Sequence, residues 1–325
     1  MREVLQAIYE QDFLDCSYGF RPKRSAHDAM RAIHQAAYRG EVQGVLEADV
    51  QSFFDSLTRV KLKEMLQIRI ADGQMMRLIG KCLHVGILDG EEFSEPDIGT
   101  TQGSILSPLL GNVYLHYALD VWFEREIRPT LEGKAQLVRY ADDFVVMCRT
   151  RAAVDEAQQR VSAVLARLGL ELHPEKTRVV DLSWGHEGFD LLGCHLRKRL
   201  SGPIRERTHR RVYFLQRWPT QRAMQRVRTR IRELTPRGRC HEDLRSVIAD
   251  VNAVVRGWGQ YFRTANAATR FAQLDRDVED RVPGLVLKRH GSRCAPGRTA
   301  AWDRPFFEAL GLCRLRGTVQ YPGAA

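Results

Sequence analysis

Three aspartates in this sequence have the residue type and the setting to hold divalent metal ions. Asp142 and Asp143 are adjacent and lie between two apolar runs, and Asp49 stands near the end of an earlier apolar run, residues 42–50. Two magnesium ions about 4 Å apart can stabilise an attacking hydroxyl and a leaving pyrophosphate together, and magnesium prefers hard oxygen ligands. If the three carboxylates converge, we expect a site that joins nucleotides to a primer end.

A solvated turn is the alternative interpretation of residues 142–143, because aspartate side chains bond to nearby backbone groups in turns. Against it, two adjacent acids stand between strands that would otherwise be buried, and Asp49 supplies a third carboxylate. The combination favours the metal interpretation.

Apolar spacing predicts the elements that must position these acids. A buried strand is expected over residues 42–50 and a hairpin with acids at its tip over 137–148. Other predicted elements are helices at 25–40, 60–70, 74–84, 108–125 and 152–168, a hairpin at 86–99 and a strand at 178–182. The result is an α+β fold in β-α-β-β-α-β order, an antiparallel sheet with helices on one face, which is the order of polymerase palms.

The charge is unevenly distributed along the chain. Residues 1–196 hold 22 Lys and Arg against 29 Asp and Glu, whereas residues 197–325 hold 28 against 11. Between Arg197 and Arg239 there are fifteen basic residues and two acids. Nucleic acid is the expected partner of such a surface. Beyond Arg197 we expect no strands and three helices, at 218–234, 244–262 and 267–282.

Residues 140–143, Tyr-Ala-Asp-Asp, resemble the acidic signature of reverse transcriptases in the form typical of group II intron enzymes. Residues 49–55 resemble the first metal motif of that family. The resemblance implies that Asp49, the Val50 carbonyl, Asp142 and Asp143 hold two Mg²⁺ ions, with Mn²⁺ as a possible substitute. It also implies that the Phe54 ring excludes the ribonucleotide 2′ hydroxyl.

Three further motifs agree with the resemblance. Residues 99–110 resemble the loop that contacts template and nucleotide, which implies that Gln102 and Gly103 bind the nucleotide, although Thr101 and Ser104 replace the usual Pro and Gly. Residues 173–177 resemble a loop whose lysine, here Lys176, lies near the leaving pyrophosphate as charge stabiliser or proton donor. Residues 189–194 resemble the hairpin that grips the primer.

The basic region resembles the maturase domain of intron-encoded proteins, which serves as a thumb and binds intron RNA. The arginines that the resemblance assigns to RNA are Arg217, Arg222, Arg226, Arg228, Arg230, Arg232 and Arg256. Arginine suits this role because its planar fork pairs with phosphate and stacks on bases. The aromatics Trp258, Tyr261 and Phe262 either pack at helical spacing or stack on RNA.

These observations predict a remnant of the fingers and palm entry (1–41), a palm (42–196), an all-α thumb and maturase domain (197–290) and a tail (291–325). The expected activity is RNA-directed DNA polymerisation, with intron RNA template, DNA primer and deoxynucleoside triphosphates as partners. The alternatives are an impaired fragment that acts only as an RNA-binding maturase, and a related enzyme of a defence or CRISPR system.

The chain lacks several features that other classes of protein carry. No apolar run approaches the roughly 20 residues of a membrane span, so we expect no membrane partner and a cytoplasmic location. The cysteines lack zinc-site spacing, so the zinc-bearing endonuclease domain of some relatives is not expected. Most of the upstream fingers region of the family is also missing, which suggests an N-terminally truncated fragment.

Overall fold

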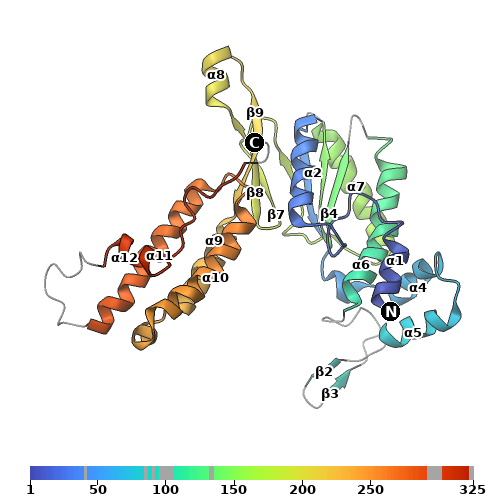
Figure 1. The fold of residues 1–325 in the computed structure, drawn as a ribbon. Helices are drawn as coiled ribbons and strands as arrows, with labels where there is room; N and C mark the ends of the chain where they lie inside the picture. Colours follow the sequence, from blue (N-terminus) through green and yellow to red (C-terminus); the bar gives the residue numbers. More distant parts are fainter. Residues whose placement is uncertain are drawn as a thin grey trace. The chain divides into compact units, whose positions relative to one another are not determined.

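The computed structural model describes residues 1–39, 42–83, 87–89, 92–94, 105–131, 135–290 and 302–321. Two compact units divide the chain (Figure 1). The first holds Met1–Phe189 and Arg197–Leu215, and the second holds Asp190–Leu196 and Gln216–Ala325.

A four-stranded antiparallel sheet forms the centre of the first unit. Its spatial order is β4-β5-β1-β6, from the strands β1 (Gly44–Asp49), β4 (Gln136–Tyr140), β5 (Asp143–Cys148) and β6 (Arg178–Asp181). The central strand β5 is apolar at successive positions and buried from Phe144 onward, as a strand covered on both faces must be. The predicted palm order is confirmed.

Two helices cover one face of this sheet. These helices are α6 (Ser107–Leu115) and α7 (Arg151–Arg167). Val113 of α6 and Val161 of α7 belong to the same apolar core as Leu46 of β1 and Val146 of β5. The Thr150 hydroxyl begins α7 by accepting a hydrogen bond from the Ala153 amide (3.2 Å). Outside these six elements, α2 (Ala26–Arg39) lies against β4.

The predicted helix over residues 108–125 is present but not regular. After α6 the chain continues through two π-helical segments, η1 (His116–Asp120) and η2 (Phe123–Ile127). A π-helical turn holds more residues than an α-helical turn and is frequent at functional sites. It therefore changes which side chains of this helix share a face.

Shorter elements complete the first unit: α1 (Arg2–Tyr9), α3 (Phe53–Ser56), α4 (Arg59–Gln67), α5 (Gly73–Leu83), and the antiparallel hairpin of β2 (Ile87–Asp89) with β3 (Glu92–Ser94). Leu5, Leu62 and Ile79 from these helices are buried in the same core. The hairpin predicted over 86–99 is thus confirmed over its described residues.

Strands continue beyond Arg197, so the prediction that they stop there was wrong. The sheet β7-β8-β9 consists of β7 (Gly188–Leu191), β8 (Cys194–Leu200) and β9 (Tyr213–Pro219), and α8 (Gly202–Thr208) lies between β8 and β9 in the chain. In β8 only Cys194 and Leu196 are buried. The alternation of buried and accessible residues in β8 covers only its first three positions, and basic residues follow. The sequence therefore shows no period of two that would predict a strand.

Helices make up most of the second unit: α9 (Gln221–Leu234), a 3₁₀ turn η3 (Arg237–His241), α10 (Leu244–Phe262), α11 (Ala268–His290) and α12 (Arg304–Ala309). The three predicted helices are present. However, α11 passes through Pro283 instead of ending before it. Proline removes one backbone hydrogen bond from a helix, and burial of Val282, Leu285 and Val286 offsets that loss. No helix in the described part of the chain has the length and apolarity for a membrane crossing.

Candidate active site

Strand ends bring the three aspartates together. Asp49 is the last residue of β1 and lies directly opposite Asp143, the first residue of β5. Asp142 precedes Asp143 in the two-residue turn between β4 and β5. Carboxylates that are about ninety residues apart in sequence therefore lie at one end of the sheet. Pairing of β1 with β5 creates this arrangement.

The acids affect each other's ionisation. Burial raises the pKa of the Asp143 carboxyl, and the negative charges of Asp49 and Asp142 raise it further. Burial likewise raises the pKa of Asp142, and Asp49 adds to that effect. Closely spaced carboxylates resist ionising together unless a positive charge compensates them. Excess negative charge at this position fits a divalent cation.

Lys176 supplies a positive charge at this cluster. Its Nζ lies 2.5 Å from Oδ2 of Asp49, and this hydrogen bond raises the pKa of the lysine. An antiparallel bridge between Val50 and Leu172 carries the loop of Lys176 to the end of β1. The structure thus brings together the four charged residues that the sequence selected.

Backbone geometry at Val50 is compatible with the predicted metal ligand. The bridge to Leu172 is made by His173 N–H donating to the Asp49 carbonyl and Gln51 N–H donating to the Glu171 carbonyl, both at 2.8 Å. These bonds do not use the Val50 carbonyl. Among the described residues, no three His, Cys, Asp or Glu side chains already enclose a position for a metal ion. The donor set is nevertheless oxygen-only, which suits Mg²⁺.

Phe53 and Phe54 divide between core and surface. Phe53 is 3% exposed and packs edge-on against Tyr114, whereas Phe54 is partly exposed. Gly111 of α6 permits this packing, because a Cβ there would lie 2.9 Å from Cε1 of Phe53 and 3.2 Å from Cε1 of Phe54. Phe54 is therefore the more accessible of the two rings. Gln102 and Gly103 lie outside the described residues.

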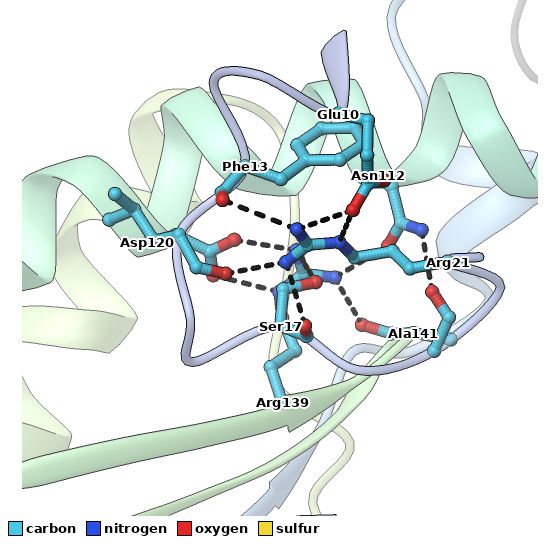
Figure 2. A network of polar contacts seen from close by, with 10 residues as sticks. Glu10, Phe13, Ser17, Arg21, Asn112, Asp120, Arg139 and Ala141 are labelled. Carbon is cyan, nitrogen blue, oxygen red and sulfur yellow. Dashed lines mark hydrogen bonds and ion pairs between the residues drawn. The ribbon is translucent and has the colours of Figure 1, made fainter. Parts of the chain in front are cut away.

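Sequence reasoning missed a polar network beneath the acidic turn (Figure 2). Arg139 of β4 is fully buried and forms an ion pair with the equally buried Asp120. Arg21 is bonded to Glu10 at its side. An arginine that directly follows the apolar Leu137 and Val138 in β4 was the available signal, because such a charge is almost never buried unpaired.

The hairpin at residues 189–194 turns through Leu192 (φ 50°) and Gly193 (φ 74°), the backbone of a tight two-residue turn. The Tyr261 hydroxyl donates to the Leu192 carbonyl (2.9 Å). Trp258 contacts the rings of Phe262 and Phe271. These aromatics of α10 follow the packing alternative.

The arginines assigned to RNA differ in their surroundings. Arg222, Arg226, Arg230, Arg232 and Arg256 are exposed, although Arg230 pairs with Glu233. Arg228 is partly buried and pairs with Asp277 at 2.6 Å. Arg217 differs from the expectation, because it is 5% exposed and its guanidinium bonds to Thr264. We therefore leave Arg217 out of the RNA-contacting set.

Exposed arginines also occur on α8, which buries none of its residues. Arg205 and Arg207 project from this helix. Arg205 and Arg207 lie within the basic stretch Arg197–Arg239. The charge density of that stretch was the signal that could have added them to the candidate RNA-binding residues.

Family models cover most of the chain. Residues 1–196 match the model "Reverse transcriptase (RNA-dependent DNA polymerase)". Residues 224–300 match the model "Group II intron, maturase-specific domain".

Several curated proteins are similar in sequence. Protein YkfC of Escherichia coli (strain K12) is 33% identical over 230 residues, 61% of this chain and 60% of YkfC. The Group II intron-encoded protein LtrA of Lactococcus lactis subsp. cremoris is 31% identical over 264 residues, 63% of this chain and 43% of LtrA. An uncharacterized 91 kDa protein in the cob intron of Schizosaccharomyces pombe is 27% identical over 336 residues, covering 84% of this chain and 41% of that protein. The chain therefore matches 41 to 60% of the length of these relatives.

Among solved structures, telomerase from Candida albicans, in complex with a fragment of telomeric RNA, has a similar fold. The TM-score is 0.51 at 13% identity, over 95% of this chain and 56% of the telomerase chain. At this identity the likeness concerns the fold alone.

Proposed function

This chain belongs to the reverse transcriptase (RNA-dependent DNA polymerase) family, and from that premise we propose a function. We propose that the chain extends a DNA primer on an RNA template by two-metal nucleotidyl transfer. The observation that carries the proposal is the register of β1 and β5, in which Asp49 faces Asp143 beside Asp142. The partners would be deoxynucleoside triphosphates, a DNA primer and the RNA of a group II intron.

Each residue of the cluster has a proposed part in that reaction. Asp49, Asp142, Asp143 and the Val50 carbonyl would hold two Mg²⁺ ions, with Mn²⁺ as a substitute. When bound, these ions stabilise the negative charge that develops on the attacking and leaving oxygens. The Lys176 ammonium, paired with Asp49, would neutralise the leaving pyrophosphate or donate a proton to it. Phe54 would exclude nucleotides that carry a 2′ hydroxyl.

A second function, binding of folded intron RNA as a maturase, is favoured by a separate observation. Residues 224–300 match the maturase-specific domain. Arg222, Arg226 and Arg232 of α9 are exposed, while Met224, Val227 and Ile231 on another side of that helix are buried. Exposed guanidinium groups on one helix suit phosphate. We propose that both functions reside in this chain.

Substitution of Asp142 by asparagine tests the polymerase proposal. The change Asp142→Asn keeps the size of the side chain and removes one carboxylate charge. We expect magnesium-dependent primer extension on an RNA template to fall by at least about a thousandfold, because metal stabilisation contributes several kcal/mol. Binding of the RNA, measured by filter retention, should be unchanged.

Asp155→Asn is the matched control. Asp155 lies on α7, where it pairs with Arg151 in an exposed i,i+4 position, so this variant should extend primers like the wild type. Extension that survives Asp142→Asn would refute the metal assignment. Loss of both extension and RNA binding would instead indicate that the variant is misfolded.

A further inference from the structure

Arg139 has no place in the proposed chemistry, yet it uses every hydrogen-bond donor that an arginine side chain has. Nε and Nη2 donate to the two carboxylate oxygens of Asp120 (2.8 and 2.6 Å). Nη2 also donates to Oγ of Ser17 (2.8 Å), and Nη1 donates to Oδ1 of Asn112 (2.9 Å). The fifth bond joins Nη1 to the Ala141 carbonyl (2.9 Å).

The bond to Ala141 reaches the acidic turn itself. The Ala141 carbonyl belongs to the peptide group whose amide is that of Asp142, so the bond fixes the orientation of the backbone that carries this carboxylate. Ala141 has φ +59°, a left-handed conformation that is unfavourable for a residue with a Cβ. The surrounding structure must therefore hold the turn in this conformation.

The π-helical segment η1 explains how one helix supplies two partners to the same guanidinium. Asn112 and Asp120 are eight residues apart, which in a regular α-helix would place them about 80° apart around the axis. The wider turn of His116–Asp120 reduces the rotation per residue. Figure 2 shows both side chains directed from this helix toward Arg139.

A second segment supports the turn from another side. Gly19 lies so close that a Cβ on it would be 2.4 Å from the Ala141 amide nitrogen, and its carbonyl accepts a hydrogen bond from Nδ2 of Asn112 (2.7 Å). Arg21 holds this segment in place through Glu10 and the carbonyls of Phe13, Leu14 and Ser17. The turn is thus held by a buried support whose central residue is Arg139.

Stability alone is a weak reason for such a support. Removing two charges from water costs several kcal/mol each, and well-packed apolar residues often replace a buried ion pair at no loss of stability. Arg139 and Asp120 are both 0% exposed in their side chains. The directed bonds of the pair therefore call for a geometric explanation.

We infer that Arg139 is a positioning residue, which sets the distance of Asp142 and Asp143 from Asp49 and thereby the capacity of the three acids to bind divalent cations. The inference rests on the proposed function of those acids. Asp120 and Asn112 orient the guanidinium, and Arg139 in turn holds the Ala141–Asp142 peptide group.

The test is the double variant Arg139→Met/Asp120→Leu, which removes both charges at once and leaves apolar side chains of similar volume. The melting temperature of this double variant should fall less than that of Arg139→Met alone, because the single change leaves Asp120 as an uncompensated buried charge. Binding of Mn²⁺, followed by electron paramagnetic resonance, should weaken at least about tenfold, which is about 1.4 kcal/mol. Primer extension should need correspondingly more Mn²⁺ to reach half its maximal rate.

If Arg139 served only folding, a folded double variant would bind Mn²⁺ with wild-type affinity. That result would overturn the inference. If the double variant does not fold, Arg139→Lys makes the same comparison, since lysine keeps a cation beside Asp120 but lacks the planar fork. Here too, unchanged Mn²⁺ affinity overturns the inference, and weakened affinity supports it.

The control pair is Arg151→Met/Asp155→Leu, which removes an exposed arginine–aspartate pair from α7 and should leave Mn²⁺ affinity unchanged. Failure of the proposed function gives a different result. If the acids do not bind metal, Asp142→Asn will bind Mn²⁺ as well as the wild type does. Wild-type binding that is lost in Asp142→Asn but kept in the Arg139 variants would reject the positioning role alone.

Discussion

At the scale of single residues, an ammonium group shares a small space with three carboxylates. Lys176 contacts Asp49 and also lies within the electrostatic influence of Asp142 and Asp143. The lysine side chain is 57% exposed, whereas that of Asp49 is 8% exposed. Lys176 can thus move into solvent while the acid stays in place. A cation that enters the cluster would compete with this ammonium.

Lys176→Gln tests that competition. The variant removes the positive charge, so we expect Mn²⁺ to bind three- to tenfold more tightly, a modest change because solvent screens an exposed ammonium. Primer extension at saturating Mn²⁺ should become slower if the lysine also assists the leaving pyrophosphate. Electron paramagnetic resonance measures the first effect and single-turnover extension the second.

Lys176→Arg is the control, because it keeps the charge and should bind Mn²⁺ like the wild type. Weaker Mn²⁺ binding in Lys176→Gln would contradict the competition, since it would mean that the lysine helps to hold the cation site together.

At the scale of elements, the helix that begins as α6 has two separate tasks. Asn112 and Asp120 face the buried support of the acidic turn, while Gly111 faces the Phe53 and Phe54 rings. A change on this helix can therefore move the Phe54 ring without touching any of the acids.

Gly111→Ala makes such a change. The new methyl group would crowd both rings, at 2.9 and 3.2 Å from their nearest atoms, and overpacking of this kind typically costs about 1–3 kcal/mol of stability. Phe54 is the less buried ring, so we expect it to yield, and to shift away from α6. The KM for deoxynucleoside triphosphates should rise about three- to tenfold in steady-state primer extension.

Gly80→Ala is the control for a helical glycine, because a Cβ at Gly80 of α5 would meet nothing within 4 Å. That variant should be neutral or stabilised by about 0.5–1 kcal/mol. If Gly111→Ala leaves the KM unchanged while Phe54→Ala alters the choice between deoxy- and ribonucleotides, the gate does not depend on the contact with α6.

At the scale of the whole molecule, the division of charge is the dominant feature. The acidic excess lies in the sequence that forms the palm, and the basic excess follows it. Basic residues that neutralise phosphates release counterions, so binding weakens steeply with salt, with a slope of about −0.7 per contact for single strands. RNA affinity and its salt dependence should therefore be set by the basic half.

The triple variant Arg222→Gln/Arg226→Gln/Arg232→Gln tests this expectation. All three side chains are exposed and lie off the buried side of α9. We expect weaker RNA binding and a salt slope about two units shallower, measured by filter retention across a salt series. The melting temperature should hardly change.

Arg228→Gln is the contrasting control, because Arg228 pairs with Asp277 of α11. Arg228→Gln should weaken RNA binding by less than one third of the free-energy change that the triple variant causes. An unaltered salt slope in the triple variant would exclude these arginines as phosphate contacts.

How far the sequence alone determined this protein differs between its parts. A helical period correctly predicted α7 and α10, because burial of one face of a helix imposes that period on the sequence. Continuous apolar runs correctly predicted β1 and the β4–β5 hairpin, because a strand covered on both faces is apolar at successive positions. Asp49, Asp142 and Asp143 were selected for the same reason, as acids that interrupt apolar strands. Strands β8 and β9 escaped, since few of their residues are buried and the basic residues mask the alternation.

What only the tertiary structure decided is which groups meet. The pairing of β1 with β5 brings Asp49 opposite Asp143, and the bridge at Val50 brings Lys176 to Asp49. Sequence analysis assigned no role to Arg139 and assigned Arg217 to RNA binding, yet both side chains are buried. Local sequence fixes the period of burial, but partners distant in the chain are chosen by packing, which depends on all the elements at once.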